Sequence, residues 1–140
     1  MELQRYLSFK FGHYTGSLDC ILYMLKASFY APTFRRFWQN WNPLWSYYLL
    51  YYLYQPMSKK LSQQTATFFT FLLSGFIHDC VAMIIMSKPS IIMTLSFSIA
   101  ALIVLLEKRL GVSALAIPKV LRPIYHIFLI TLSALPVAFA

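Results

Sequence analysis

The chain has 140 residues, of which 59% are hydrophobic and only 11% are charged, and its mean hydropathy is +0.62. Soluble domains usually contain about a quarter charged residues, so the composition excludes an ordinary soluble domain and favours an integral membrane protein. The net charge of +8 does not indicate a nucleic-acid-binding protein, because the basic residues lie between apolar segments, as membrane topology determinants do.

The first 64 residues contain two short apolar stretches. The sequence begins without the basic and apolar regions of a secretory signal peptide. Residues Leu18–Ala31 include two charged side chains and predict an amphipathic or interfacial helix. Leu44–Pro56 is rich in Trp and Tyr, which gather at the membrane–water boundary, so we expect an interfacial or re-entrant segment or one buried steeply against other helices.

Three longer apolar segments follow, at Thr65–Met86, Ser90–Leu106 and Pro123–Ala140. A membrane-spanning helix needs roughly 20 apolar residues, so each segment is a candidate span. The predicted fold class is an all-α integral membrane protein with three to four transmembrane helices plus aromatic interfacial or re-entrant helices. We expect one membrane-embedded domain, 1–140, with its interfacial helices in 1–64 and its transmembrane helices in 65–140.

The basic residues predict the orientation of these spans. Loops Met57–Gln64 and Glu107–Arg122 together hold six Lys or Arg residues, whereas the loop between the first two spans holds only Lys88. Because positive residues concentrate on the cytoplasmic side, both basic loops should face the cytoplasm. We expect a multi-pass protein of a bacterial inner membrane.

His78 lies about 20 Å along the first predicted span at 1.5 Å per residue, well inside the hydrocarbon region. Ionisable residues at that depth are costly and often functional. Ser74 and Thr67, at i−4 and i−11, share the helical face of His78, and Gly75 beside them permits close approach of another backbone or a ligand. A buried structural histidine is the alternative interpretation.

Asp79 follows on a different face, so it should not contact the imidazole, but it can pair with a basic or hydroxyl group of another helix. Two adjacent ionisable residues in mid-membrane are hard to explain by packing. The two cysteines, Cys20 and Cys80, form no CxxC pair, so we expect neither a disulfide framework nor a metal site.

Trp38, Trp41 and Trp45 recur at i, i+3 and i+7, which predicts one helical face and is typical of an interfacial anchor. Asn42 precedes Pro43, and a proline disfavours helical conformation at the residue before it. The Asn42 carboxamide can therefore cap a helix, or it can present a fixed donor and acceptor to a site.

Taken in order, three elements resemble the membrane-bound O-acyltransferase family. They are F-W-x-x-W-N at Phe37–Asn42, Y-x-P at Tyr54–Pro56 and S-G-x-x-H at Ser74–His78, within Phe29–Met86. Asn42 and His78 stand 36 residues apart, which is also similar to that family.

The resemblance implies an enzyme that transfers an acyl group from a thioester, with acyl-CoA as co-substrate and no other cofactor, to the hydroxyl of a lipid or other acceptor. It implies that His78 is the general base and that Asn42 holds or polarises a reactant. Neighbouring motif residues would bind substrate: Trp38, Trp41, Ser74, Gly75 and Asp79.

Members of this family have many more transmembrane helices than are predicted here. The alternative is therefore a non-catalytic membrane scaffold, or a truncated acyltransferase-like subunit that needs a partner. We also expect a homo-oligomer, because His78 and Asp79 would otherwise face lipid at high cost. Small residues would permit the contacts between copies: Gly75, Ala82, Ser96, Ser98, Ala100 and Ala101.

Overall fold

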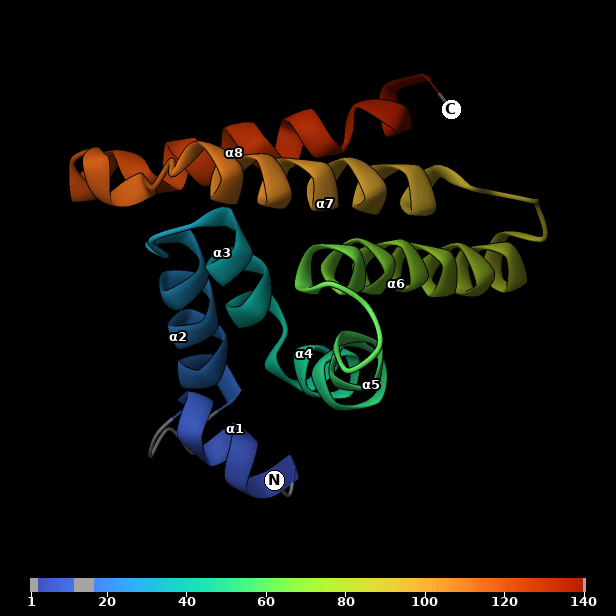
Figure 1. Ribbon diagram of the computed structural model, residues 1–140, viewed down its shortest axis with the longest axis horizontal. Helices are drawn as coiled ribbons and strands as arrows, with labels where there is room; N and C mark the ends of the chain where they lie inside the picture. Colours follow the sequence, from blue (N-terminus) through green and yellow to red (C-terminus); the bar gives the residue numbers. More distant parts are fainter. Residues whose placement is uncertain (1–2, 12–16, 140) are drawn as a thin grey trace.

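The computed structural model describes residues 3–11 and 17–139, and this part of the chain contains helices and no strand. The predicted all-α class is therefore confirmed. Figure 1 shows two groups of helices: α6, α7 and α8 run side by side along the long axis, and α1 to α5 lie against one side of this layer.

The N-terminal group begins with α1 (Leu3–Phe11), α2 (Ser17–Phe29) and α3 (Phe34–Trp41). Helix α2 corresponds to the predicted amphipathic helix. Figure 1 shows α2 and α3 packed together and running steeply away from α7. The α3 helix starts where the Thr33 hydroxyl accepts a hydrogen bond from the Arg36 N–H, an N-cap that satisfies one of the free donors of the first turn.

A second helical run follows the break at Asn42, whose φ of −142° and ψ of 90° are extended, as the following proline predicts. The run consists of α4 (Pro43–Tyr48), a π-helical segment (Leu49–Tyr54) and α5 (Gln55–Ser58). Within the π-helical segment each carbonyl bonds five residues ahead, as in the hydrogen bond from the Gln55 N–H to the Leu50 carbonyl. Such segments are rare and occur most often at functional sites.

The long helices are α6 (Gln63–Met86), α7 (Ile92–Leu110) and α8 (Arg122–Ser133). Ser62 caps the start of α6 by accepting from the Thr65 N–H. Helix α7 continues four residues beyond the predicted Leu106 and ends at Gly111, whose φ of 65° is the left-handed conformation of many helix ends. Short 3₁₀ segments complete the chain at Ala114–Ala116, Lys119–Leu121 and Leu135–Phe139.

Of the helices in the described residues, α6 alone is both long and apolar enough to cross a membrane. Charged residues near the end of α7 reduce its apolar length, and α8 stops after 12 residues. Pro136 explains the early stop of α8, since it lacks the N–H that the Leu132 carbonyl would accept and its ring clashes there. The expected count of three to four spans therefore stays a prediction.

Asp79 joins α6 to the start of α7. Its Oδ1 atom accepts from the Ser90 hydroxyl at 2.9 Å and the Met93 N–H at 3.0 Å, and its Oδ2 atom accepts from the N–H and the hydroxyl of Thr94, each at 2.7 Å. The N-cap residue of α7, Ile91, has no side-chain acceptor, so Asp79 supplies the missing cap from another helix.

Gly75 permits the same two helices to approach closely. A Cβ atom at this position would lie 2.6 Å from the Met93 carbonyl oxygen and 2.7 Å from the Thr94 Cα. The close approach that glycine provides at this position is therefore to another backbone. The expectation that Asp79 faces lipid unless a second copy covers it is wrong, because Asp79 is only 1% exposed within this single chain.

Glu107 makes a second connection of the same kind at the other end of α7. Both of its carboxylate oxygens lie 2.9 Å from the Phe34 nitrogen, the first of α3, and its Oε1 accepts from the Tyr125 hydroxyl of α8 at 2.8 Å. A carboxylate is favourable at a helix N-terminus because of the free N–H groups and the helix dipole. Glu107 thus ties α3 and α8 to α7.

An aromatic core fills the space between α3, α7 and α8. Phe34 and Phe37 are fully buried, and His126 stacks on both, with ring centroids 6.3 and 5.4 Å away. The His126 Nε2–H donates to the Ala31 carbonyl at 3.0 Å, since a carbonyl can only accept. Among the described residues, His126 is therefore a buried histidine with a structural role.

Small residues make close contacts within the chain. Ala100 and Ala101 are at most 1% exposed, Ser96 is 8% exposed, and Gly75 abuts α7. The expectation that these four positions join separate copies is not met, because α6, α7 and their neighbours already occupy them.

Candidate active site

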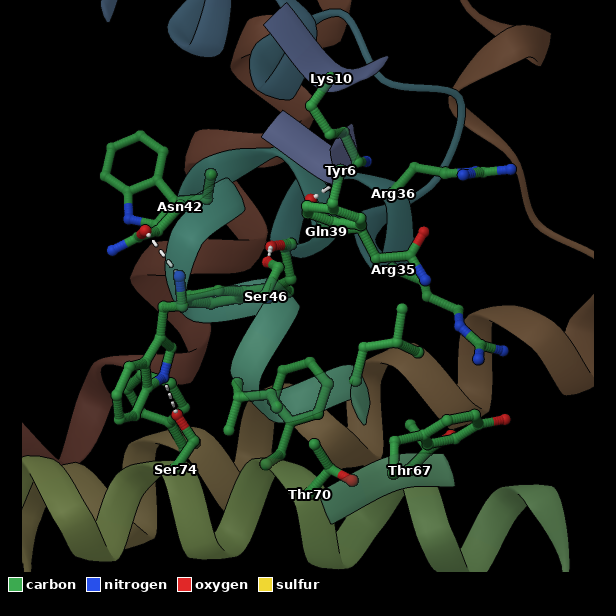
Figure 2. A pocket seen from close by; sticks show the side chains of 18 of the residues that line it. Tyr6, Lys10, Arg35, Arg36, Gln39, Asn42, Ser46, Thr67, Thr70 and Ser74 are labelled. Atoms are coloured by element: carbon green, nitrogen blue, oxygen red, sulfur yellow. Dashed lines mark hydrogen bonds between the residues drawn. The ribbon is translucent and has the colours of Figure 1, made fainter. Parts of the chain in front are cut away.

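A cavity of about 390 Å³ opens between α1, α3, the helical run after Asn42, and the faces of α6 and α7. Aromatic and hydroxyl side chains line most of it, and Figure 2 shows the arrangement. Its wall from α6 consists of residues on one helical face: Thr67, Thr70, Phe71, Ser74 and His78. This is the face that the spacing in the sequence predicts.

His78 has one ring nitrogen engaged and one free. Nδ1 lies 2.7 Å from the Ser74 carbonyl oxygen, one helical turn earlier. A carbonyl oxygen only accepts, so Nδ1 carries the hydrogen and the neutral ring keeps its lone pair on Nε2. No other hydrogen bond to His78 exists among the described residues, and the side chain is exposed. The imidazole therefore presents a free proton acceptor beside the cavity.

Two aromatic rings fix the His78 side chain. Phe97 of α7 stacks on the imidazole, with centroids 5.1 Å apart and an interplanar angle of 27°. Trp45 of α4 meets it edge to face at 5.7 Å and 86°. The Trp45 indole N–H also donates to the Ser74 hydroxyl oxygen at 3.0 Å, a bond drawn in Figure 2.

Asn42 lies at the junction of α3 and α4 and lines the same cavity as His78. Its Oδ1 atom accepts from the Trp45 backbone N–H at 3.0 Å, so its side chain caps α4. The Nδ2 group has no hydrogen bond within the described residues and stays available as a donor. Asn42 can therefore cap α4 with its Oδ1 atom and at the same time present its Nδ2 group as a donor.

The opposite end of the cavity is cationic. Figure 2 shows Lys10, Arg35 and Arg36 at this mouth, away from Asn42 and Ser74. Lys10 donates to Asn40 Oδ1 at 3.1 Å, and Arg35 lies 5.9 Å from the centroid of the Tyr54 ring. Burial, and secondly the charge of Arg36, lower the pKa of Lys10. The mouth is thus suited to an anionic group.

The phenol of Tyr6 belongs to the same mouth. Burial and the neighbouring Tyr51 raise its pKa, so the hydroxyl stays protonated and adds no negative charge beside the cations.

Among the described residues no group of histidine, cysteine and acidic side chains is placed to hold a metal ion.

A model of the membrane-bound O-acyltransferase family matches residues 23–135, four fifths of the chain. The chain belongs to this family. The match extends well beyond Phe29–Met86, where the sequence motifs lie, and includes α7 and most of the C-terminal part. Neither a curated relative nor a solved structure matches the chain.

The family's motif residues fall into two groups in this acyltransferase-like structure. The cavity is lined by Asn42, Trp38, Trp41, Ser74 and His78. Gly75 and Asp79 do not line it and lie at the contact between α6 and α7. The structure therefore does not place Gly75 and Asp79 where they were expected, in the wall of the substrate cavity.

Several cavity residues were not among those expected at the site, and Trp45, Lys10 and Phe97 are examples. Trp45 was interpreted only as an anchor, although its distance from Trp41 gave the signal of a common face. Lys10 and Phe97 had no local signal, because each reaches the cavity from a distant part of the sequence. The three tryptophans line one cavity, but the break at Asn42 places them on two helices.

Proposed function

We propose that this protein is an acyl-CoA-dependent O-acyltransferase in which His78 is the general base. Family membership supports acyl transfer. The observation that carries the role of His78 is its hydrogen bond from Nδ1 to the Ser74 carbonyl, which leaves Nε2 free beside a cavity shared with Asn42. A neutral imidazole in this state accepts a proton from a hydroxyl within hydrogen-bond reach.

The reaction proceeds by addition and elimination. Nε2 of His78 takes the acceptor's proton as the hydroxyl oxygen attacks the thioester carbonyl carbon. The tetrahedral intermediate then expels the thiolate, which receives the proton from the imidazolium, so the products are an ester and free CoA. The free Nδ2 donor of Asn42 is suited to stabilise the oxyanion, although its partner is a reactant that the structure does not contain.

The charge distribution along the cavity supports acyl-CoA as the donor. Thr67 and His78 lie 11 residues apart on α6, roughly 16 Å along the helix. Of the cations at the mouth, Arg35 lies beside Tyr54, which precedes the basic loop expected to be cytoplasmic. The phosphates of CoA would bind at this mouth, and the acyl thioester would reach the end that His78 lines.

The location follows from the same features. We propose a multi-pass protein of a bacterial inner membrane, with Met57–Gln64 and Glu107–Arg122 on the cytoplasmic side, supported by the six-to-one excess of basic residues. Cysteines introduced at Lys60 and Lys108 should resist an impermeant reagent applied outside intact cells. Efficient labelling at both would reverse the orientation.

We also propose that several copies assemble. His78 is exposed in the isolated chain, and large apolar side chains of α6, α7 and α8 are exposed as well, among them Phe76, Leu102 and Phe128. Symmetric closed assemblies are the usual way to cover such a surface. The mass of the active species in nanodiscs tests this proposal, which an active monomer would refute.

The enzyme is tested by incubating the purified protein in nanodiscs with radiolabelled acyl-CoA and a lipid hydroxyl acceptor. We expect labelled ester and an equal amount of free CoA, and loss of both in His78→Ala. Wild-type rates in that variant would refute the role of His78. If neither product forms with any acceptor class, the alternative of a non-catalytic scaffold or a subunit that needs a partner is favoured.

A further inference from the structure

Trp45 contacts both motif residues of the site. Its backbone N–H donates to Asn42 Oδ1, its indole N–H donates to the Ser74 hydroxyl oxygen, and its ring meets the imidazole of His78. Asn42 and His78 lie 36 residues apart in the sequence, and Trp45 connects them, with its backbone bound to Asn42 and its side chain in contact with Ser74 and His78.

The Ser74 hydroxyl is the decisive partner. Ser74 is 1% exposed, and its carbonyl is the group that accepts from His78 Nδ1. A buried hydroxyl is strongly favoured to keep a hydrogen-bond partner. The indole N–H therefore restrains the same residue that sets the tautomer of the imidazole.

The imidazole is otherwise free to turn, because the second side-chain torsion of histidine is broad. Three contacts restrict it: the Ser74 carbonyl at Nδ1, the Phe97 ring on one face and Trp45 at its edge. Of the three tryptophans, Trp45 is the one whose indole N–H has a hydrogen-bond partner within the described residues.

We propose that Trp45 is a positioning residue that couples the Asn42 cap to the orientation and tautomer of His78. The inference rests on the proposed function of His78 as the base. It assigns to Asn42 an indirect part in catalysis, through the start of α4, in addition to any contact with a reactant.

The first test replaces Trp45 with phenylalanine in the full chain, which keeps a ring and removes the N–H. We expect kcat to fall by about tenfold to a hundredfold with little change in KM for acyl-CoA, since small displacements of a catalytic group cost up to about this much. Tyr52→Phe is the matched control, because Tyr52 lies on the same helical run, is 68% exposed and does not line the cavity. It should keep the wild-type kcat.

A second measurement is independent of acyl transfer. NMR of the protein labelled with ¹⁵N-histidine reports the tautomer, and the His78 signal is identified by its loss in His78→Ala. We expect a single Nδ1–H form in the wild type and a mixture of tautomers in Trp45→Phe. An unchanged tautomer together with an unchanged kcat overturns the inference while leaving the proposed function standing. A tautomer change in a protein without acyl transfer would refute the function and leave the positioning role intact.

Ser74→Ala removes the other partner of the same bond and serves if Trp45→Phe does not fold. It should reproduce the fall in kcat and the mixed tautomers. The double variant should be no slower than the worse single variant, because groups that act through one bond are not additive. Fully additive losses would overturn the inference.

Discussion

The adjacent residues His78 and Asp79 lie in two unlike regions of the protein. Asp79 is almost completely buried between α6 and α7, and both of its oxygens are occupied by donors. His78 is exposed beside the cavity, and Nε2 of its ring has no partner among the described residues. On α6, Asp79 therefore has all of its carboxylate oxygens hydrogen-bonded, and His78, the residue before it, has a free acceptor nitrogen.

This difference separates a structural ionisable residue from a chemical one. Both residues are costly in an apolar helix, so the sequence marks them equally. The neighbouring helix distinguishes them, because α7 offers donors to Asp79 and an aromatic face to His78. Burial and full hydrogen bonding therefore assign Asp79 to the folded structure, whereas the exposure of His78 beside the cavity fits its proposed role as a base.

The variant His78→Ala should have the largest effect and tests whether His78 acts in catalysis and not in folding. We expect kcat for acyl transfer to fall by about 10²- to 10⁴-fold, the usual contribution of a positioned acid or base. The unfolding midpoint in detergent should stay at the wild-type value, because the lost hydrogen bond belongs to an exposed side chain. Steady-state kinetics and thermal unfolding measure the two effects. A large loss of stability would place His78 in the structural class.

Asp79→Ala should give the reverse result. It leaves the N–H groups of Met93 and Thr94 without acceptors, and each buried unpaired group costs about 1–3 kcal/mol. We expect a loss of about 3 kcal/mol in the free energy of unfolding, measured with denaturant, and a kcat near wild type for the folded fraction. Asp79→Asn keeps one carboxamide oxygen and should lose less. Full stability in Asp79→Ala would contradict the capping role.

Gly75→Ala sharpens the comparison at the same helix contact. The added Cβ would lie 2.6 Å from the Met93 carbonyl oxygen, and backbone atoms cannot move aside as a flexible side chain does. Overpacking of this kind costs about 1–3 kcal/mol, which the same unfolding experiment should detect. Gly111→Ala is a poor control because of its positive φ, so Val81→Ala, at a position of α6 that is 51% exposed, is preferable. Equal stability of Gly75→Ala and wild type would show that α6 and α7 lie farther apart.

The smallest expected effect concerns the cationic mouth. Because burial and the charge of Arg36 lower the pKa of Lys10, its positive charge is lost at a lower pH than that of an ordinary lysine. KM for acyl-CoA should therefore rise a few-fold at alkaline pH, and high salt should have the same effect by screening. Lys10→Met should abolish this pH dependence while leaving kcat unchanged. A pH-independent KM in the wild type would remove Lys10 from the donor site.

Local patterns in the sequence predicted the helices well where their ends depend on nearby residues. Helix α6 begins two residues before the predicted Thr65 because Ser62 caps it, and it ends at the predicted Met86. Asn42 was expected to leave helical conformation before Pro43, and it does. Helix α8 ends before the predicted Ala140, because Pro136 interrupts the hydrogen bonding of the preceding turn.

The candidate site was predicted only in part, because several of its contacts join distant segments. The pattern on α6 gave the face with Thr67, Ser74 and His78. No local pattern shows that Asp79 caps α7, that Trp45 reaches Ser74, or that Lys10 approaches Arg36. These contacts depend on how helices pack, which periodicity within one helix does not specify.

Helix α7 contributes only Phe97 to the cavity lining, yet two of the helices that form the cavity's walls, α3 and α6, are attached to it. Asp79 fixes the start of α7 to α6 and Glu107 fixes its far end to α3, and the 13 helical steps from Thr94 to Glu107 place these two attachment points roughly 20 Å apart along α7. One residue inserted between them would turn one end by about 100° relative to the other. Only one of the two carboxylate caps could then form. The length of α7 between its two attachment points is therefore tightly constrained, and substitutions within α7 away from Phe97 should be tolerated far better than insertions or deletions.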